Sequence, residues 1–274
     1  MAKQTGYKVQ GDTMQGMYIA GADGTAYCWK NTPGISATLR FMDKGLEGFK
    51  ARPPARIEIA EAQKTAAFSR APKPTTSLIY VVSRVRPIPE GCDSRNRNIG
   101  KDYLWIYPEE VDAIVDTAVD RETFSLPTTL VARIVRYNLL DLIRGEPDYW
   151  EVREIKKAEF TVKRGATVDG KQSFTFNANF AMSTLWLTRG VEGTMEGEFT
   201  VDMAASKITR WRAYAKTQAW GAGRFTYRGV PKNKFPLIFA MTETDEQVAK
   251  DIPPSAVSRR SNYKVPDGHE RLAR

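Results

Sequence analysis

The sequence has very little histidine and cysteine, which many enzymes need for chemistry. Its single histidine, His269, lies within the last six residues. A Ser-His-Asp triad or a multi-histidine metal site would need that end of the chain to fold back over the body. The two cysteines, Cys28 and Cys92, form no Cys-x-x-Cys pair, which argues against a redox dithiol or a zinc knuckle. We expect two buried thiols, with one disulfide as the alternative in an exported protein, and no metal or cofactor.

Long apolar runs are also missing. The longest, at residues 78–82, has the length of a strand, whereas a membrane-spanning helix needs about 20 apolar residues. Residues 1–6 contain no apolar signal core. The sequence therefore predicts either a cytoplasmic protein or the trimmed mature form of an exported one, and it does not separate these two cases.

The overall composition is that of a globular protein with a basic surface. Hydrophobic residues make up 42% of the 274 residues and charged residues 27%, enough for one large domain or two small ones. The net charge of +9 favours an anionic partner without identifying it. No helix-turn-helix, zinc-finger or RNA-recognition signature accompanies this charge, so nucleic acid is not the expected partner.

Residues 1–52 are predicted to form a small hairpin and helix unit. Strands at 14–19 and 25–29 flank an Asp-Gly turn, which is a strong hairpin signal. A helix is expected from Pro33, because proline suits the first helical position. Its apolar residues recur at steps of three and four, which predicts one buried stripe. These residues are Ile35, Leu39, Met42 and Leu46. Residues 53–76, with prolines near both ends, are predicted to be a connector.

Residues 77–255 are predicted to form an α+β domain. An apolar strand at 77–84 and a second strand at 103–107 enclose a polar loop. Helices should begin at Pro108 and Pro127. The second of these helices has a stripe of apolar residues that should face the core. They are Leu130, Ile134, Tyr137 and Leu140.

Residues 154–242 are predicted to form an antiparallel meander. Its strands are expected at 154–163, 172–187, 192–203, 207–220 and 235–241, and the third alternates apolar and polar residues with a period of two. The inward residues should include Phe174, Phe176, Phe180, Phe199 and Val201. The expected fold is α+β, with helices packed on a curled antiparallel sheet that forms an open or partial barrel. Residues 256–274 are predicted to be a flexible, poorly packed basic tail.

Four stretches of the sequence resemble a family of uncharacterised bacterial proteins. They are residues 21–29, 77–84, 102–107 and, most clearly, 141–150. The resemblance extends from about residue 14 to about residue 255 and carries no assigned activity, so it implies no site residues. The N-terminal unit looks like the last strand-strand-helix portion of a thioredoxin-like fold. Its redox Cys-x-x-Cys is missing here, so the resemblance does not support an oxidoreductase.

The first candidate site lies in residues 144–150. Glu146 and Asp148 would form an acid/base or cation-binding pair in an enzyme. The alternative is a structural ion pair between Arg144 and Glu146, with Tyr149 and Trp150 covering the junction of helix and sheet. We favour the structural interpretation, because residues two apart on an irregular segment have no fixed relative orientation.

Two further candidate sites are basic. Arg95 and Arg97 lie in a polar loop whose guanidinium groups would suit an anion. On the strand at 207–220, Arg210, Arg212 and Trp220 share one face with other basic and aromatic residues, as in some single-strand binding proteins. Acidic residues on the neighbouring strand explain the same pattern by cross-strand pairing, which we favour.

The leading functional hypothesis is therefore a non-enzymatic binding or structural protein that uses its curled sheet. A carboxylate-dependent enzyme and a non-specific nucleic-acid binder are the alternatives. Substrate, partner, biological process and oligomeric state stay open at this point.

Overall fold

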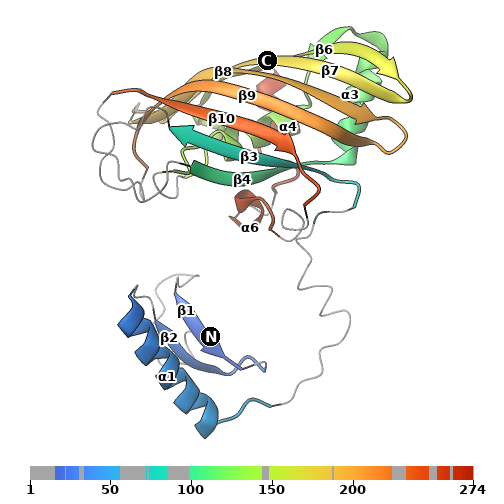
Figure 1. Ribbon diagram of the computed structural model, residues 1–274. Coiled ribbons are helices and arrows are strands. Elements are labelled where there is room, and N and C mark those ends of the chain that lie inside the picture. The colour runs from blue at the N-terminus through green and yellow to red at the C-terminus, as the bar shows by residue number, and fades with distance from the viewer. Residues whose placement is uncertain are drawn as a thin grey trace. The chain divides into compact units, whose positions relative to one another are not determined.

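The computed structural model describes residues 16–21, 23–30, 34–55, 72, 74–85, 99–143, 148–186, 188–223, 233–246, 252–259 and 262–273. The chain divides into two compact units, residues 1–69 and residues 70–274, which are described separately (Figure 1). In the part of the chain that is described, no helix is long and apolar enough to cross a membrane.

The N-terminal unit is a two-stranded hairpin followed by a helix. Strand β1 (Met17–Ala20) pairs antiparallel with β2 (Ala26–Lys30), and α1 (Ile35–Ala51) follows. Gly24 adopts a φ of 81°, in the left-handed region that glycine tolerates best, and the Asp23 carboxylate accepts a hydrogen bond from the Thr25 amide at 2.9 Å. The predicted hairpin and helix are therefore confirmed.

The buried face of α1 differs from the predicted one. The buried residues are Phe41 and Gly45, whereas the predicted stripe is exposed. A Cβ on Gly45 would lie 2.3 Å from Cδ1 of Ile19, so the hairpin approaches the helix at a position that only glycine allows. The prediction of a buried stripe at Ile35, Leu39, Met42 and Leu46 is wrong, because the helix packs on the hairpin through the face that carries Phe41 and Gly45.

The C-terminal unit is built on an open sheet of eight antiparallel strands in the order β4-β3-β10-β9-β8-β7-β6-β5. In chain order the strands are β3 (Ser77–Val85), β4 (Ile99–Ile106), β5 (Thr123–Ser125), β6 (Ile155–Val168), β7 (Lys171–Ser183), β8 (Arg189–Asp202), β9 (Lys207–Gly221) and β10 (Phe235–Glu243). Strands β6 to β10 form the predicted meander. The predicted α+β fold with an open curled sheet is confirmed.

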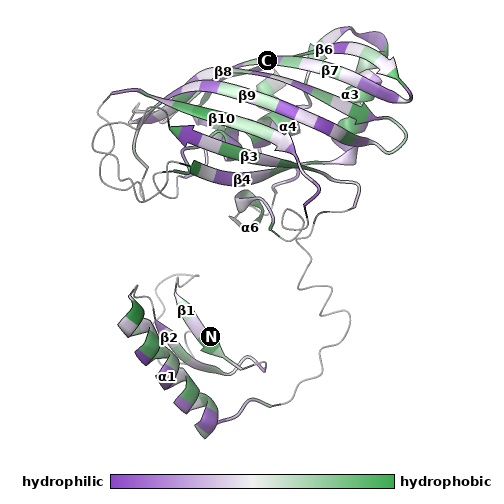
Figure 2. Cartoon of the chain, viewed as in Figure 1, coloured by the Kyte–Doolittle hydropathy of each residue, from purple (hydrophilic) through white to green (hydrophobic). Residues whose placement is uncertain are grey.

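The inner face of the sheet carries an aromatic core. Phe174 stacks on Phe199 with ring centroids 4.8 Å apart, and Phe199 stacks on Trp211 at 5.2 Å. All five residues that were predicted to face inward are buried, namely Phe174, Phe176, Phe180, Phe199 and Val201. Hydrophobic and hydrophilic bands alternate along these strands, as the period of two requires (Figure 2). Side chains therefore fill the curl.

Two helices lie against the sheet. α3 (Pro108–Asp120) and α4 (Thr128–Arg133) begin next to the predicted prolines, and α4 continues as a π-helical turn at Ile134–Asn138. The predicted stripe from Leu130 to Leu140 is buried, but so is every residue between these two. A helix buried all round must be covered on the face that turns away from the sheet.

The C-terminal segment packs beside α4. It contains the short helix α6 (Ser255–Arg259) and the 3-10 turn η5 (His269–Ala273). Between them, Tyr263 is buried, with its ring 5.8 Å from that of Tyr137 and 6.1 Å from that of Trp105. For the described residues of the 256–274 segment, the prediction of poor packing is wrong, because the buried ring of Tyr263 docks a segment whose composition is otherwise polar.

Truncating Tyr263 should release this segment. Tyr263→Ala should lower the free energy of unfolding by about 3 kcal/mol, as expected when a buried aromatic side chain is removed. Val265→Ala, at an exposed position two residues away, should change it by about 0.5 kcal/mol or less. Urea unfolding of both variants measures this difference, and equal effects would contradict the packing described here.

Candidate functional site

Aromatic and cationic side chains gather at the end of the sheet where β7 turns into β8. We call this group the tryptophan rim. It consists of Trp150, Leu185, Trp186, Arg189, Trp220 and Lys234. Its residues come from the β7–β8 turn, the start of β8, the end of β9, the segment before β10 and the segment after α4.

The turn between β7 and β8 presents two apolar side chains to solvent. Trp186 is 87% exposed and Leu185 is 65% exposed. The base of the turn is held by the Thr184 amide, which donates to the carbonyl of Arg189 at 3.0 Å, and the Thr184 and Thr188 hydroxyls lie 3.0 Å apart. The apolar tip therefore projects from a closed hairpin.

Arg189 covers Trp150 at the open end of the curl. Its guanidinium carbon lies 4.1 Å from the centroid of the Trp150 ring, and Nη1 donates to the Asp148 carbonyl at 2.8 Å. Burial lowers the pKa of Arg189, although nearby carboxylates oppose that shift. Arg189, Trp150 and Trp220 line a cavity of about 20 Å³, which is room for about one water molecule. The end of the curl is plugged rather than open.

Trp220 lies on the outer side of this plug. A Cβ on Gly190 would lie 2.0 Å from the Trp220 ring, so the indole occupies the space that glycine leaves. The Lys234 ammonium lies 4.5 Å from the centroid of the same ring and also pairs with Glu192. Gly221 has a φ of 74°, and a Cβ there would lie 1.6 Å from the Thr188 carbonyl oxygen. The end of β9 is therefore packed tightly against the turn that carries Trp186.

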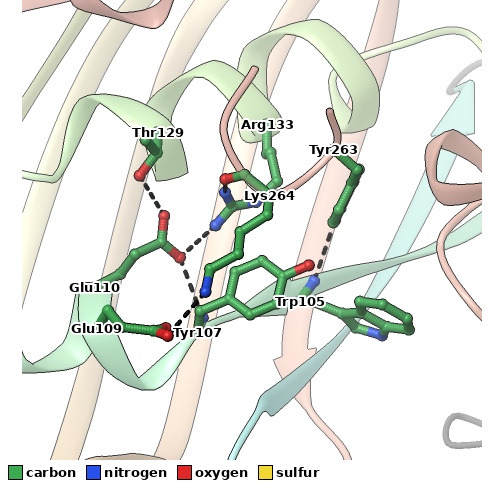
Figure 3. Close-up of polar contacts among 8 residues, drawn as sticks. All are labelled: Trp105, Tyr107, Glu109, Glu110, Thr129, Arg133, Tyr263 and Lys264. Atoms are coloured by element: carbon green, nitrogen blue, oxygen red, sulfur yellow. Dashed lines mark hydrogen bonds and ion pairs between the residues drawn. The ribbon is translucent and has the colours of Figure 1, made fainter. Parts of the chain in front are cut away.

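A second polar cluster surrounds Arg133, which is fully buried (Figure 3). Its Nη2 donates to the Glu110 carboxylate, and its Nη1 donates to the Lys264 carbonyl at 2.6 Å. The Glu110 carboxylate also accepts hydrogen bonds from the Tyr107 amide at 3.1 Å and from the Thr129 hydroxyl. The same carboxylate therefore caps the start of α3 and neutralises Arg133. We call this group the Arg133 network.

The same network holds the C-terminal segment from several sides. The Lys264 ammonium donates to the Glu109 carboxylate at 2.8 Å (Figure 3), and Arg133 lies 5.1 Å from the Tyr107 ring centroid. Burial raises the pKa of Tyr107 to about 12, so this hydroxyl stays protonated at neutral pH. One turn later, Arg136 donates to the Asp267 carbonyl at 2.9 Å. Because both arginines bind main-chain carbonyls, we interpret the network as structural.

Asp102 forms a third buried polar contact. Its Oδ1 accepts from the Ser255 amide at 2.9 Å, from the Ser255 hydroxyl at 3.1 Å and from the Tyr103 amide at 2.8 Å. Burial raises the pKa of Asp102 above its ordinary value of 3.8, although these hydrogen bonds oppose the shift. Asp102 thereby ties β4 to the start of α6.

The structure brings two of the predicted site residues together. Asp148 and Trp220 both lie at the tryptophan rim, the first through its carbonyl and the second through its ring. The Asp148 side chain is exposed. Four other candidates lie outside the described residues. They are Arg95, Arg97, Arg144 and Glu146.

Arg210 and Arg212 lie elsewhere on β9. At about 3.3 Å per residue, Arg212 is roughly 26 Å from Trp220 along the strand. Arg210 forms an ion pair with Glu198 at 2.5 Å, and Arg212 lies opposite Glu198 in the strand register. The expected cross-strand acidic neighbour is therefore present.

The sequence-based predictions missed Leu185, Trp186 and Arg189. They extended one strand through residue 187, whereas β7 ends at Ser183. Leu185 and Trp186 look like strand residues by composition, which concealed a turn with no glycine or proline.

His269 and Cys28 take no part in the tryptophan rim. The Nδ1 of His269 lies 2.9 Å from the Pro266 carbonyl oxygen. Cys28 is a buried free thiol, and Cys92 lies outside the described residues. Among the residues that can be described, no three His, Cys, Asp or Glu side chains gather in a way that would hold a metal ion.

Comparison with protein-family models, with curated proteins and with solved structures finds no match to this chain. Functional inference therefore rests on the geometry of the chain itself.

The Arg133 network predicts a large difference between two adjacent glutamates. Glu110→Gln leaves the buried Arg133 without its counter-charge and should lower the free energy of unfolding by about 3 kcal/mol. Glu109→Gln removes an exposed ion pair with Lys264 and should cost about 0.5 kcal/mol. Chemical denaturation of both variants tests the assignment, which similar losses would refute.

Asp102 predicts a dependence of stability on pH. Its folded pKa is raised, so the folded state holds the proton more tightly than the unfolded state, and stability falls as the pH rises above about 3.8. Asp102→Asn should therefore be more stable than the wild type at pH 7, and the difference should shrink towards pH 4. Thermal unfolding across this range measures it. A variant that is less stable at pH 7 would show that the ionised carboxylate is favoured in the fold.

Proposed function

We propose that this chain is a non-enzymatic binding protein that holds a protein partner at the end of its curled sheet, through the tryptophan rim. The observation that carries the proposal is the exposure of Trp186 on a closed turn. Exposed tryptophan and leucine side chains on a fixed turn are suited to act as anchors, because tryptophan is among the residues that dominate binding energy at protein interfaces.

Because side chains fill the interior of the curled sheet, a binding site on its surface is favoured over one inside it. Phe176, Phe199 and Trp211 contact one another within the sheet, and Arg189 with Trp150 closes its end. A partner that uses the curled sheet would therefore contact its rim.

The chemistry of the rim favours a protein surface over a lipid one. Arg189 is engaged by Trp150 and the Asp148 carbonyl, and Lys234 by Trp220 and Glu192. Binding to anionic lipid needs a cluster of several accessible cations, which these pairings do not provide. An apolar pocket on another protein would accept Leu185 and Trp186 directly. Acidic groups around that pocket would suit the net charge of +9.

A photo-crosslinking side chain tests this proposal. Placed at Leu185 in the full chain within its native cell, it should give a discrete protein adduct. Adding Trp186→Asp should reduce that adduct at least tenfold, because the anchor is lost. The control position is Val168, which is 62% exposed in the β6–β7 hairpin at the opposite end of the sheet.

Three results would contradict the proposal. One is no discrete adduct from position 185, and a second is an equal adduct from position 168. A third is co-sedimentation of the purified chain with vesicles containing 30% phosphatidylserine that depends on Trp186, because the rim would then bind a membrane.

A further inference from the structure

Helix α1 exposes an apolar stripe that the N-terminal unit contacts only at one end, where the Phe49 ring packs against the Tyr27 ring with centroids 5.9 Å apart. Its five residues are between 44% and 82% exposed. They are Ile35, Leu39, Met42, Leu46 and Phe49. The hairpin occupies a different face of the helix, where Phe41 and Gly45 are buried. Along α1, hydrophobic bands alternate with hydrophilic ones (Figure 2).

The spacing of the stripe is that of a coiled-coil seam. The five residues follow one another at steps of four, three, four and three. In heptad terms, Leu39 and Leu46 take a positions, while Ile35, Met42 and Phe49 take d positions. A helix that packs only on a hairpin has no need of this regular 3.5-residue period. The pattern suits a second helix lying alongside.

We infer that the stripe pairs with α1 of a second copy of this chain, with the two helices parallel and in register. In this arrangement each of the five apolar residues meets its own equivalent, so one patch is complementary to itself around a two-fold axis. An antiparallel pairing that aligns Leu39 with Met42 also aligns Ile35 with Leu46, but it leaves Phe49 uncovered. The parallel register buries more of the stripe.

The available area sets the strength of this dimer. An aromatic side chain buries on the order of 150–250 Å² when it is fully enclosed, and an aliphatic one buries less. Five side chains that are about half exposed, four of them aliphatic, then offer at most roughly 500 Å² per copy, or about 1,000 Å² in total, which is at the lower limit for a specific interface. Helix α1 is already folded against its hairpin, so pairing does not bear the cost of helix nucleation. We expect a dissociation constant in the micromolar range, on the order of 10 μM.

This inference is independent of the tryptophan rim, because it rests on a different unit of the chain. Sedimentation velocity of the full chain between about 1 and 300 μM tests it. The mass should rise with concentration from 30.8 kDa towards twice that value. Leu46→Glu should shift the midpoint to at least tenfold higher concentration. Lys44→Glu is the control, because Lys44 is an exposed residue of α1 outside the stripe, and it should leave the midpoint unchanged.

Orientation needs a second measurement. Ile35→Cys places a thiol at a d position in the first turn of α1, where parallel, in-register helices bring the two equivalents together and antiparallel helices place them at opposite ends. Mild oxidation should give a disulfide-linked dimer that Leu46→Glu abolishes. A chain that stays monomeric at 300 μM would overturn the inference, and so would a dimer that persists in Leu46→Glu. A concentration-dependent dimer without the Ile35→Cys crosslink would overturn the parallel arrangement.

Discussion

The fold of the C-terminal unit depends on neutralising a fully buried charge. Arg133 lies in the middle of the helical layer, and Glu110 supplies the opposite charge from the first turn of α3. The other N–H donors of Arg133 also need acceptors, and the carbonyl of Lys264 provides one. A buried ion pair contributes little net stability by itself, but losing either partner is costly. The main effect of the pair is therefore to determine which segments pack together. Its net contribution to the stability of the fold is small.

The packing around this ion pair bears on which surfaces are left for the proposed binding. Once the helices and the C-terminal segment are held against the sheet, the inner face becomes a packed core of aromatic rings. Exposed apolar side chains that lie next to one another are then candidates for contact with other molecules. Two such groups are Leu185 with Trp186 at the tryptophan rim and the five-residue stripe along α1, whereas other exposed apolar residues are scattered. These two surfaces are the basis of our two proposals, that the rim binds a protein partner and that α1 pairs with a second copy of the chain.

Much of the sheet could be predicted from the sequence, because alternation along a strand reports directly which side chains are buried. Phe174, Phe199 and Val201 illustrate this. Two of the failures depend on contacts between segments far apart in the sequence. Gly45 lets the hairpin approach α1 closely, since Ile19 occupies the space where a side chain would be. Tyr263 docks a polar segment through partners more than a hundred residues away, which composition does not reveal. At the candidate site, Trp220 could be identified from the sequence because it lies on the same strand face as the basic residues. Trp186 could not, because its exposure depends on where β7 ends and the turn begins.

The most direct test of this account is amide hydrogen exchange in an Arg133→Met variant, compared with the wild type. If Arg133 joins the helical layer to the C-terminal segment, amides in residues 128–143 and 262–273 should lose protection together. Amides in β7, β8 and β9 should keep theirs, because the ladder hydrogen bonds of these strands do not involve Arg133. Unchanged protection of residues 262–273 in the variant would contradict the account, because some other contact would then hold that segment in place.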